Sequence, residues 1–316
     1  MIIFESKDLC RAAELLQRGE IIAFPTETVY GLGAPIFNEE AVQKIFKAKG
    51  RPSDNPLIAH ISSMQQIDQI AVEVPKIFYT LANLFFPGPL TLVVKKHPLV
   101  PRVVSAGLDT IAIRMPSHPI AQSLIQQVGQ PIVAPSANLS GRPSSTTYEH
   151  VREDFNGKIA GVIAAEPSAI GIESTVVSLL SDVPILLRPG HVTKDQIEVA
   201  LGGNIQVATS KIHRGPVQSP GMKYRHYAPK ASVRLFYDQQ KALNYIATNH
   251  TARMILSSQS LGEALVPVFP LTKKNFYSLL READHREVEE VIILLDEATL
   301  RDEGLINRVL RSAEPI

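Results

Sequence analysis

The sequence predicts an α/β protein, with a larger domain built on a mixed sheet followed by a smaller α/β domain. Amphipathic helical segments alternate with short β-branched apolar runs along the chain, which is typical of this class. Several apolar runs follow one another with no helix between them, which favours a mixed rather than a purely parallel sheet. The chain has 316 residues, 45% hydrophobic and 20% charged, enough for about two globular domains.

The elements of the larger domain, residues 1–204, follow from hydrophobic periodicity and from helix boundary signals. Asn38 followed by two acids marks a helix start, Pro119 suits a first turn, and Gly19 and Gly203 suit helix ends. We expect helices at residues 7–19, 38–49, 74–86, 118–129, 147–157 and 193–203. We expect strands at residues 21–24, 56–61, 90–96, 110–116, 130–135, 161–166, 173–180 and 184–190.

The composition changes after Gly203. No Asp or Glu occurs from Val199 to Tyr237, while prolines, glycines and cations are frequent, so residues 205–231 are expected to be a linker. Helices and strands then alternate again, which predicts a second α/β domain at residues 232–316, large enough to fold alone with a modest core. Its expected strands are residues 232–237, 252–258, 266–271 and 288–295, and its expected helices are residues 238–250, 275–285 and 300–313.

Composition also limits the setting in which the protein works. A net charge of +1 gives no overall attraction to nucleic acid or to an anionic membrane. The single cysteine, Cys10, cannot form an internal disulfide or a CxxC metal site, so a reducing, cytoplasmic setting is expected. The N-terminus has early charges and no long apolar core, unlike a secretory signal. The uncharged stretch from Ile77 to Val94 is divided by Pro87 and Pro89, which favours a buried helix, a turn and a strand over a membrane span.

Several catalytic motifs are absent from the sequence. There is no G-x-x-x-x-G-K-[ST] phosphate loop, and the G-x-G at Gly31 and Gly33 lacks the third glycine of a dinucleotide fingerprint. No serine lies in G-x-S-x-G, and the histidines are far apart with no HExxH. We therefore expect neither a covalent nucleophile nor a resident catalytic metal, and attention turns to polar clusters that follow the predicted strands.

The first two clusters each allow two interpretations. In residues 24–34, FPTETVYGLGA, the hydroxyls of Thr26, Thr28 and Tyr30 would point to one side if the chain stays extended, or would satisfy the backbone of a turn. In residues 47–60, the cations Lys47, Lys49 and Arg51 either neutralise a helix C-terminus or form a corner that grips phosphate.

The remaining clusters lie later in the chain. Arg114 ends a predicted strand in which Ile111 and Ile113 face one way and Ala112 and Arg114 the other, so its guanidinium either extends to water or presents a fork to a carboxylate. Small hydroxyl and amide side chains crowd residues 131–147, and polar residues also occupy 173–175 and 188. Open α/β sheets bind ligands beyond strand ends, so these clusters predict one polar ligand site.

Seven segments occur in the order FPTETVYGLGA, KAKGRPSDNPL, PGPLTLV, RMPSHP, APSANLSGRPSST, ESTVV and LRPG. This order resembles the YrdC-type domain of threonylcarbamoyl-AMP synthases, and SPGMKYRHYAPKA resembles the linker of their two-domain form. The resemblance covers residues 1 to about 232. It implies a twisted mixed-sheet YrdC-type domain and a smaller Rossmann-like α/β domain. It also implies a transferase, specifically a nucleotidyltransferase, that makes threonylcarbamoyl-AMP and pyrophosphate from L-threonine, bicarbonate or CO2, and ATP.

The resemblance further implies the site residues. The threonine site would use Thr28, His60, Arg114, Ala134 and Ser174. The ATP site would use Arg51, Asn55, Thr110, Ser136, Asn138, Ser144, Arg188 and Tyr227, with Tyr227 and the linker folding back over the nucleotide. Lys49, Arg51 and Arg188 would stabilise charge on the phosphates, with Mg²⁺ carried by ATP.

The resemblance implies partners too. The product would feed t6A modification of tRNA position 37 through downstream t6A-transfer proteins in the cytoplasm. We expect a monomer with no stable nucleic-acid binding and no membrane binding.

Two other functions remain open from the sequence. A basic surface of Lys47, Lys49, Arg51 and the linker cations could hold RNA, although the near-neutral charge and the lack of a basic, aromatic-interleaved stripe count against it. A carbamoyl-transfer enzyme is the second alternative, but the acylphosphatase and zinc-finger segments that normally accompany that role are not visible.

Overall fold

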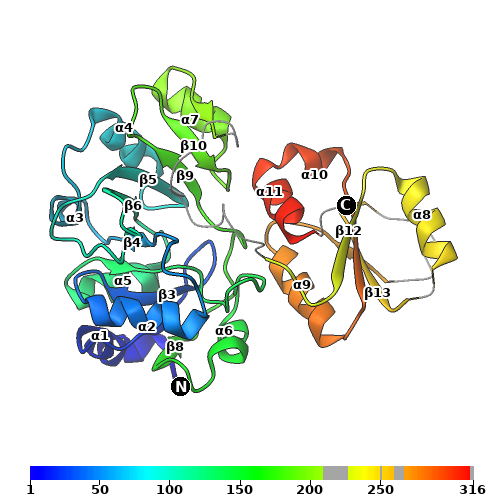
Figure 1. The fold of residues 1–316 in the computed structure, drawn as a ribbon, viewed down its shortest axis with the longest axis horizontal. Coiled ribbons are helices and arrows are strands. Elements are labelled where there is room, and N and C mark those ends of the chain that lie inside the picture. The colour runs from blue at the N-terminus through cyan, green and yellow to red at the C-terminus, as the bar shows by residue number, and fades with distance from the viewer. Residues whose placement is uncertain (209–226, 250, 260–266, 314–316) are drawn as a thin grey trace. The chain divides into compact units, whose positions relative to one another are not determined.

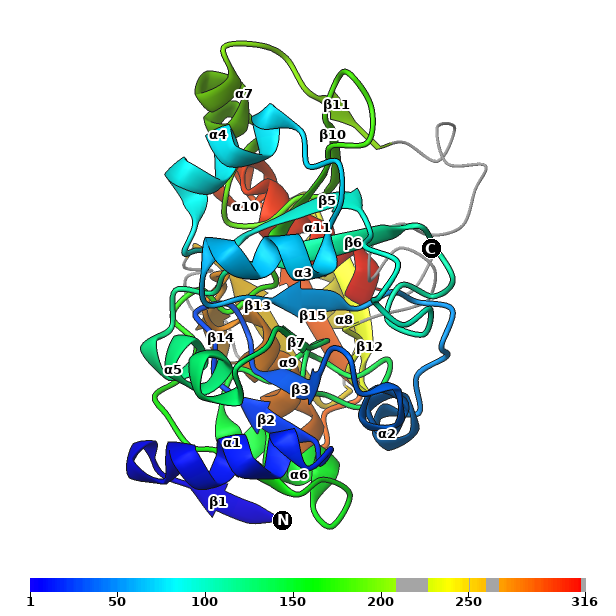
Figure 2. The same ribbon diagram turned by 90° about the vertical axis from the view of Figure 1, so that its left-hand side faces the viewer.

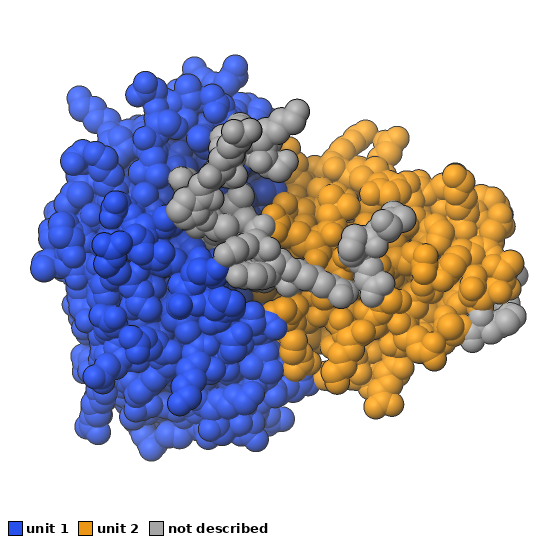
Figure 3. Space-filling model, in the orientation of Figure 1, with its two compact units in different colours: residues 1–140, 145–223 blue, residues 141–144, 224–316 orange. Residues whose placement is uncertain are grey.

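The computed structural model describes residues 1–208, 227–249, 251–259 and 267–313. Contacts group the chain into two compact units, shown in Figure 3: unit 1 comprises Met1–Ser140 and Ser145–Lys223, and unit 2 comprises Gly141–Ser144 and Tyr224–Ile316. Within the described ranges, no helix has both the length and the apolar character needed to cross a membrane.

Unit 1 is built on one mixed sheet, as the sequence predicts (Figure 2). The strands lie in the order β1 (Ile2–Phe4), β8 (Gly161–Ile163), β2 (Ile22–Phe24), β3 (Gly31–Pro35), β7 (Ile132–Val133), β4 (Ile58–His60), β6 (Thr110–Arg114), β5 (Leu90–Lys95), β9 (Thr175–Ser178), β10 (Ile185–Arg188) and β11 (Gln206–Val207). Parallel pairs such as β4–β6 and β5–β9 alternate with antiparallel pairs such as β5–β6 and β9–β10. Strand β11 lies inside the segment predicted as a linker, residues 205–231, and it pairs with β10.

The predicted helices of unit 1 are present, with ends within two residues of those expected. They are α1 (Leu9–Gln17), α2 (Glu39–Lys49), α3 (Ile67–Ile70), α4 (Lys76–Phe85), α5 (Pro119–Val128), α6 (Tyr148–Phe155) and α7 (Lys194–Leu201), with 3₁₀ turns η1 (Ser6–Asp8) and η2 (Met64–Gln66). The Asn38 side chain accepts a hydrogen bond from the Ala41 amide and starts α2, and Gly50 ends it in the left-handed conformation. The short η2–α3 segment is not predicted by the sequence, because one helical turn is too short to show a periodicity.

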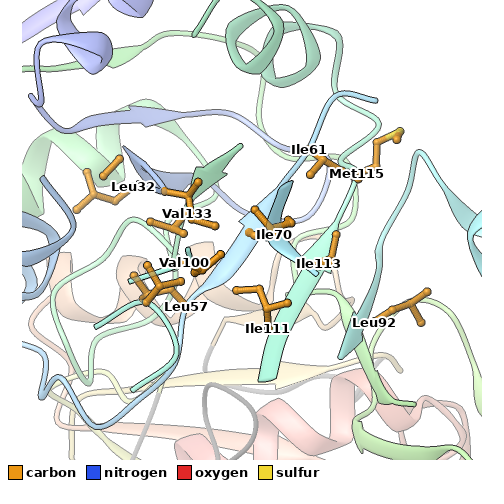
Figure 4. Close-up of a cluster of buried hydrophobic side chains, with 14 of the residues drawn as sticks. Leu32, Leu57, Ile61, Ile70, Leu92, Val100, Ile111, Ile113, Met115 and Val133 are labelled. Atoms are coloured by element: carbon orange, nitrogen blue, oxygen red, sulfur yellow. The ribbon is translucent and has the colours of Figure 1, made fainter. Parts of the chain in front are cut away.

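The core of unit 1 lies on both faces of the sheet. One cluster, part of which is shown in Figure 4, includes Leu32, Ile111, Ile113 and Val133, while Ala112 packs in a different cluster, so the predicted alternation along β6 is confirmed. Helices α1 and α5 pack against each other and bury a second cluster that contains Phe24. The fold therefore separates the two faces of β6.

The glycines of residues 24–34 have a packing role. A methyl group on Gly33 would lie 2.9 Å from both Ile132 Cγ2 and the Phe24 ring, and one on Gly31 would lie 3.2 Å from the Phe24 ring. Only glycine leaves room for the Phe24 ring across strand β3. The pair of glycines thus allows a close side-chain approach.

Unit 2 has a sheet of its own in the order β12 (Ser232–Phe236), β15 (Glu290–Leu294), β13 (Arg253–Ser257) and β14 (Val268–Pro270), and all three strand pairings are parallel. Its helices are α8 (Gln239–Thr248), α9 (Phe276–His285), α10 (Glu297–Arg301) and α11 (Glu303–Ser312). Helix α8 lies on one face of the sheet, and α9 and α11 lie on the other (Figure 1). The predicted Rossmann-like α/β architecture is confirmed.

Candidate functional site

Two predicted threonine-site residues lie side by side at the ends of neighbouring parallel strands. His60 ends β4, Arg114 ends β6, and the two residues are paired in the sheet register. Both are buried, at 4% exposure each. The interpretation that Arg114 extends to water is therefore wrong, because its guanidinium is buried against Glu27, Thr28 and Gly88.

The Arg114 guanidinium makes three hydrogen bonds within unit 1. Nη1 donates to Thr28 Oγ1 at 2.8 Å, Nη2 donates to Glu27 Oε1 at 2.6 Å, and Nε donates to the Gly88 carbonyl at 3.3 Å. A guanidinium carries more N–H groups than these three bonds use, so donors remain on Arg114 for a ligand. The guanidinium is thus held rigidly at the strand end by a carboxylate, a hydroxyl and a carbonyl.

Thr26 and Thr28 lie in a turn that their own hydroxyl groups stabilise. The Thr26 hydroxyl donates to the Val29 carbonyl at 2.6 Å, so the 2.9 Å contact between the two hydroxyls must have Thr28 as donor. Thr28 Oγ1 also accepts from Arg114, and its remaining capacity is as an acceptor only. The chain bends over residues 27–29, and the Tyr30 hydroxyl instead donates to the Ala165 carbonyl. The backbone is not extended here, so the alternative interpretation, a turn whose backbone is satisfied by hydroxyls, is confirmed.

Glu27 completes a buried ion pair with Arg114. The side chains of Glu27 and Arg114 are 10% and 5% exposed. Burial acts to raise the pKa of the Glu27 carboxyl, but the charge and hydrogen bond of Arg114, with backbone N–H groups of Glu27 and Ser117, bring the net pKa below its usual value. Glu27 Oε2 is buried and makes no hydrogen bond with any residue that the structure describes.

His60 is held as a neutral acceptor. Its Nδ1 lies 3.1 Å from the Ile58 carbonyl, which can only accept, so Nδ1 carries the proton and Nε2 is an acceptor. Burial, followed by the nearby Arg114 charge, lowers the pKa of His60 to about 3. The Phe24 ring meets His60 edge-on at 6.0 Å. The Ala134 amide donates to the same Ile58 carbonyl at 3.0 Å, which places Ala134 beside His60.

Ser174, a predicted threonine-site residue, and Arg188, a predicted ATP-site residue, are in direct contact. Arg188 Nη2 donates to Ser174 Oγ at 3.2 Å and its Nε donates to the Ser174 carbonyl at 3.1 Å. Ser174 Oγ also lies 2.7 Å from Thr91 Oγ1. The next residue, Thr175, donates its amide to the Pro89 carbonyl, adjacent to the Gly88 carbonyl that Arg114 contacts. Two hydrogen-bonded groups, one around Arg114 and one around Arg188, are therefore connected through the backbone at Gly88 and Pro89.

The predicted phosphate-binding residues lie at the end of α2 and after it. Lys49 is buried, and its Nζ donates to the Ser136 carbonyl at 2.5 Å and to the Asn138 carbonyl. Arg51 Nη2 donates to the carbonyls of Asn55 and Pro56, each at 3.3 Å. Asn55 is buried, and its Oδ1 makes no hydrogen bond with the described residues. Lys49 thus connects α2 to the segment of Ser136 and Asn138, while Arg51 bonds to the backbone of the turn before β4.

Of three further predicted ATP-site residues, one lies in unit 1 and two belong to unit 2. Thr110 begins β6, four residues before Arg114, so the two lie at opposite ends of the strand, about 13 Å apart by strand rise. Ser144 is buried and belongs to unit 2. Tyr227 also belongs to unit 2, where its ring lies 5.3 Å from that of Tyr277. Most of the predicted linker, residues 209–226, lies outside the described residues, so its position over the nucleotide stays a prediction.

A cavity of about 710 Å³ lies at the C-terminal end of α2. Its lining includes Lys44, Lys47, Lys49 and Lys158, and Lys44 is paired with Glu20 at 2.9 Å. Lys49 is the member of the predicted site that reaches it. The cavity does not include Arg114 or His60, so the network above is identified by its hydrogen bonds rather than by this cavity.

Glu27 is the residue that sequence reasoning missed. It stands between Thr26 and Thr28 in the first polar cluster, and the hydroxyls alone were assigned significance there. The available signal was its charge, because a carboxylate directly after a buried strand and an arginine at the end of another are expected to pair.

Comparison with known proteins gives two family matches and several close relatives. A family described as telomere recombination matches residues 14–190, and one described as threonylcarbamoyl-AMP synthase, C-terminal domain, matches residues 192–314. The chain is 52% identical over 230 residues to the threonylcarbamoyl-AMP synthase of Bacillus subtilis, a match that covers 72% of this chain and 66% of that protein, just under two thirds.

Two further relatives match nearly the whole chain. The threonylcarbamoyl-AMP synthase of Schizosaccharomyces pombe is 34% identical over 361 residues, covering 96% of this chain and 88% of the relative. A solved structure, P. abyssi Sua5 complexed with L-threonine, is similar over 99% of this chain and 98% of its own, with 40% identity and a TM-score of 0.93.

Proposed function

The chain belongs to the threonylcarbamoyl-AMP synthase family, and from this premise we propose that it is a nucleotidyltransferase that forms threonylcarbamoyl-AMP and pyrophosphate from L-threonine, bicarbonate or CO2, and ATP. The observation that supports this most strongly is the direct contact of Arg188 with Ser174 at 3.2 Å. It places a residue expected to bind phosphate against a residue expected to bind threonine, so the two substrates would meet at this point.

Threonine would bind in the buried network of unit 1. The remaining N–H groups of Arg114 suit the amino-acid carboxylate, because a guanidinium binds carboxylate through directed, charge-assisted bonds. Thr28 Oγ1 and His60 Nε2 can both only accept, and each suits the substrate hydroxyl as donor. The relative crystallised with L-threonine, 40% identical to this chain, supports the choice of amino acid.

The proposed chemistry requires alignment and charge neutralisation rather than a nucleophilic side chain. The threonine amine combines with CO2 or bicarbonate to give a carbamate, one of whose oxygens attacks the α-phosphorus of ATP as pyrophosphate leaves. Lys49, Arg51 and Arg188 would neutralise the phosphate oxygens, and fixed cations of this kind supply most of the catalysis in such reactions. Mg²⁺ would arrive with the ATP phosphates as part of the substrate.

We propose that the product serves t6A formation in tRNA through downstream transfer proteins, in the cytoplasm and with the enzyme acting as a monomer. Ser144, Thr110 and Tyr227 would complete the nucleotide site. Attack of the carbamate on the α-phosphorus gives threonylcarbamoyl-AMP, a hydrolysable mixed anhydride, and the linker would exclude water from it.

Pyrophosphate release tests the proposal directly. With ATP and bicarbonate present, release should depend on added L-threonine. Release that is the same without threonine contradicts the proposed activity. A salt titration of RNA binding separates the RNA-binding alternative, since phosphate-driven binding weakens steeply with salt. Activity with carbamoyl phosphate in place of bicarbonate would favour the carbamoyl-transfer alternative.

A further inference from the structure

We infer that Glu27 is a substrate-binding residue whose second carboxylate oxygen, Oε2, accepts the α-ammonium group of the amino acid. The inference rests on the proposed function, because it concerns the same pocket. It assigns to the pocket a ligand class, the zwitterionic α-amino acid.

The first observation is an acceptor without a partner. Glu27 is 8% exposed, and Oε2 is buried with no hydrogen bond to the described residues. Burying a charged oxygen without a hydrogen bond costs folding free energy. Native structures keep such an oxygen where a ligand or a water molecule donates the missing hydrogen bond. Oε1 is occupied by Arg114 at 2.6 Å, so Oε2 is the oxygen that remains for a ligand.

The second observation is the charge of the pair. The pKa of Glu27 is held below its usual value, so the carboxylate is ionised and the Glu27–Arg114 pair has no net charge. Each partner nevertheless keeps bonding capacity: donors on Arg114 and one acceptor oxygen on Glu27. A zwitterion matches this pattern, with its carboxylate on the guanidinium and its ammonium on the carboxylate, and it leaves no buried charge uncompensated.

The third observation excludes the neighbouring acceptors as the charged partner. Thr28 Oγ1 and His60 Nε2 also accept hydrogen bonds, but neither carries a negative charge. An ammonium forms its stronger, charge-assisted bond with a carboxylate. Thr28 and His60 are therefore left for the β-hydroxyl, and Glu27 selects for the amino group.

Binding of L-threonine without ATP, measured by calorimetry on the full chain, tests the assignment. In Glu27→Gln, which keeps the shape but not the charge, the Kd for threonine should rise about 10- to 100-fold, the range for a hydrogen bond to a charged group. The Kd for 3-hydroxybutyrate, which is threonine without its amino group, should change by less than about threefold. Glu20→Gln serves as the matched control, because Glu20 is half-exposed and pairs with Lys44, and it should leave both affinities unchanged.

The wild-type protein gives an independent arm that needs no variant. It should bind threonine at least about 10-fold more tightly than 3-hydroxybutyrate. Equal affinities, or a Glu27→Gln protein that binds threonine as the wild type does, would overturn the inference. A Glu27→Gln protein that loses both ligands equally would overturn it as well, since that result makes Glu27 only a support for Arg114. If the wild type binds no threonine at all, the proposed function fails instead.

Discussion

Replacing Arg114 with methionine should destabilise unit 1 more than any loss of packing would explain. The substitution keeps an apolar side chain at the end of β6 but removes the partner of Glu27, leaving a carboxylate that is 10% exposed without its counter-charge. Breaking a buried ion pair in this way costs about 3–5 kcal/mol. The hydrogen bonds to Thr28 and Gly88 are lost with it.

The double variant Arg114→Met/Glu27→Gln separates the charge from the packing. Because it removes the stranded carboxylate, we expect it to recover about 1–3 kcal/mol of the loss, the usual size of coupling between contacting residues. The assay is urea unfolding, followed through the transition that shifts on adding threonine to the wild type, since that transition reports unit 1.

The dependence on pH provides a second check with a defined sign. In the wild type the pKa of Glu27 is below its ordinary value of 4.5, so its contribution is present above that value and is lost as the pH falls through the folded-state pKa. In Arg114→Met both contributions of Arg114 are lost and burial is the largest influence that remains, so the pKa of Glu27 rises, and the instability should be greatest at neutral pH and shrink towards pH 4.5. A deficit that is independent of pH, or a double variant as unstable as the single one, would refute this reasoning.

Three further predictions concern catalysis, selectivity and packing. Arg51→Ala should lower threonine-dependent pyrophosphate release at least about 100-fold and leave the calorimetric Kd for threonine unchanged; a normal rate would remove Arg51 from the phosphate site. L-Serine, which lacks only the methyl group of threonine, should have a kcat/KM about 10- to 200-fold lower than threonine. L-Valine, which lacks the hydroxyl group, should have a kcat/KM about 10⁴-fold lower. A kcat/KM for serine equal to that for threonine would exclude a pocket that is fitted to the threonine methyl group. Gly33→Ala should destabilise unit 1 by about 1–3 kcal/mol, because the new methyl would lie 2.9 Å from Ile132 and the Phe24 ring; unchanged urea unfolding would show that the core yields there.

The sequence predicted the fold well where local patterns and tertiary packing agree. The alternation of Ile111, Ala112 and Ile113 reports directly which face of β6 each side chain occupies, and the structure confirms it. The mixed sheet was predictable from strands that follow one another without a helix. The order of the strands was not, because β7 pairs with both β3 and β4 through contacts distant in sequence.

The candidate site was only partly predictable for the same reason. Thr28, His60, Arg114 and Ser174 were identified from the resemblance. The structure links the first three by a hydrogen bond and by register, and it links Ser174 to Arg188. Glu27 was missed because its significance depends on Arg114, which lies 87 residues further along the chain. The bend of the backbone at residues 27–29 likewise arises from hydroxyl–backbone bonds that compete with an extended strand, which a pattern of alternating hydroxyls does not reveal.

The central claim is that one pocket holds the head of an amino acid beside the α-phosphate of ATP. A crystal structure of the full chain with L-threonine and a non-hydrolysable ATP analogue measures this directly, through the distance from the threonine nitrogen to the α-phosphorus. We predict about 5 Å, the reach of a carbamate whose oxygen stands at an attack distance of about 3–3.5 Å, with the threonine carboxylate on Arg114 and the phosphates near Arg188. Ligands bound on separate surfaces, or threonine away from Arg114, would contradict the account.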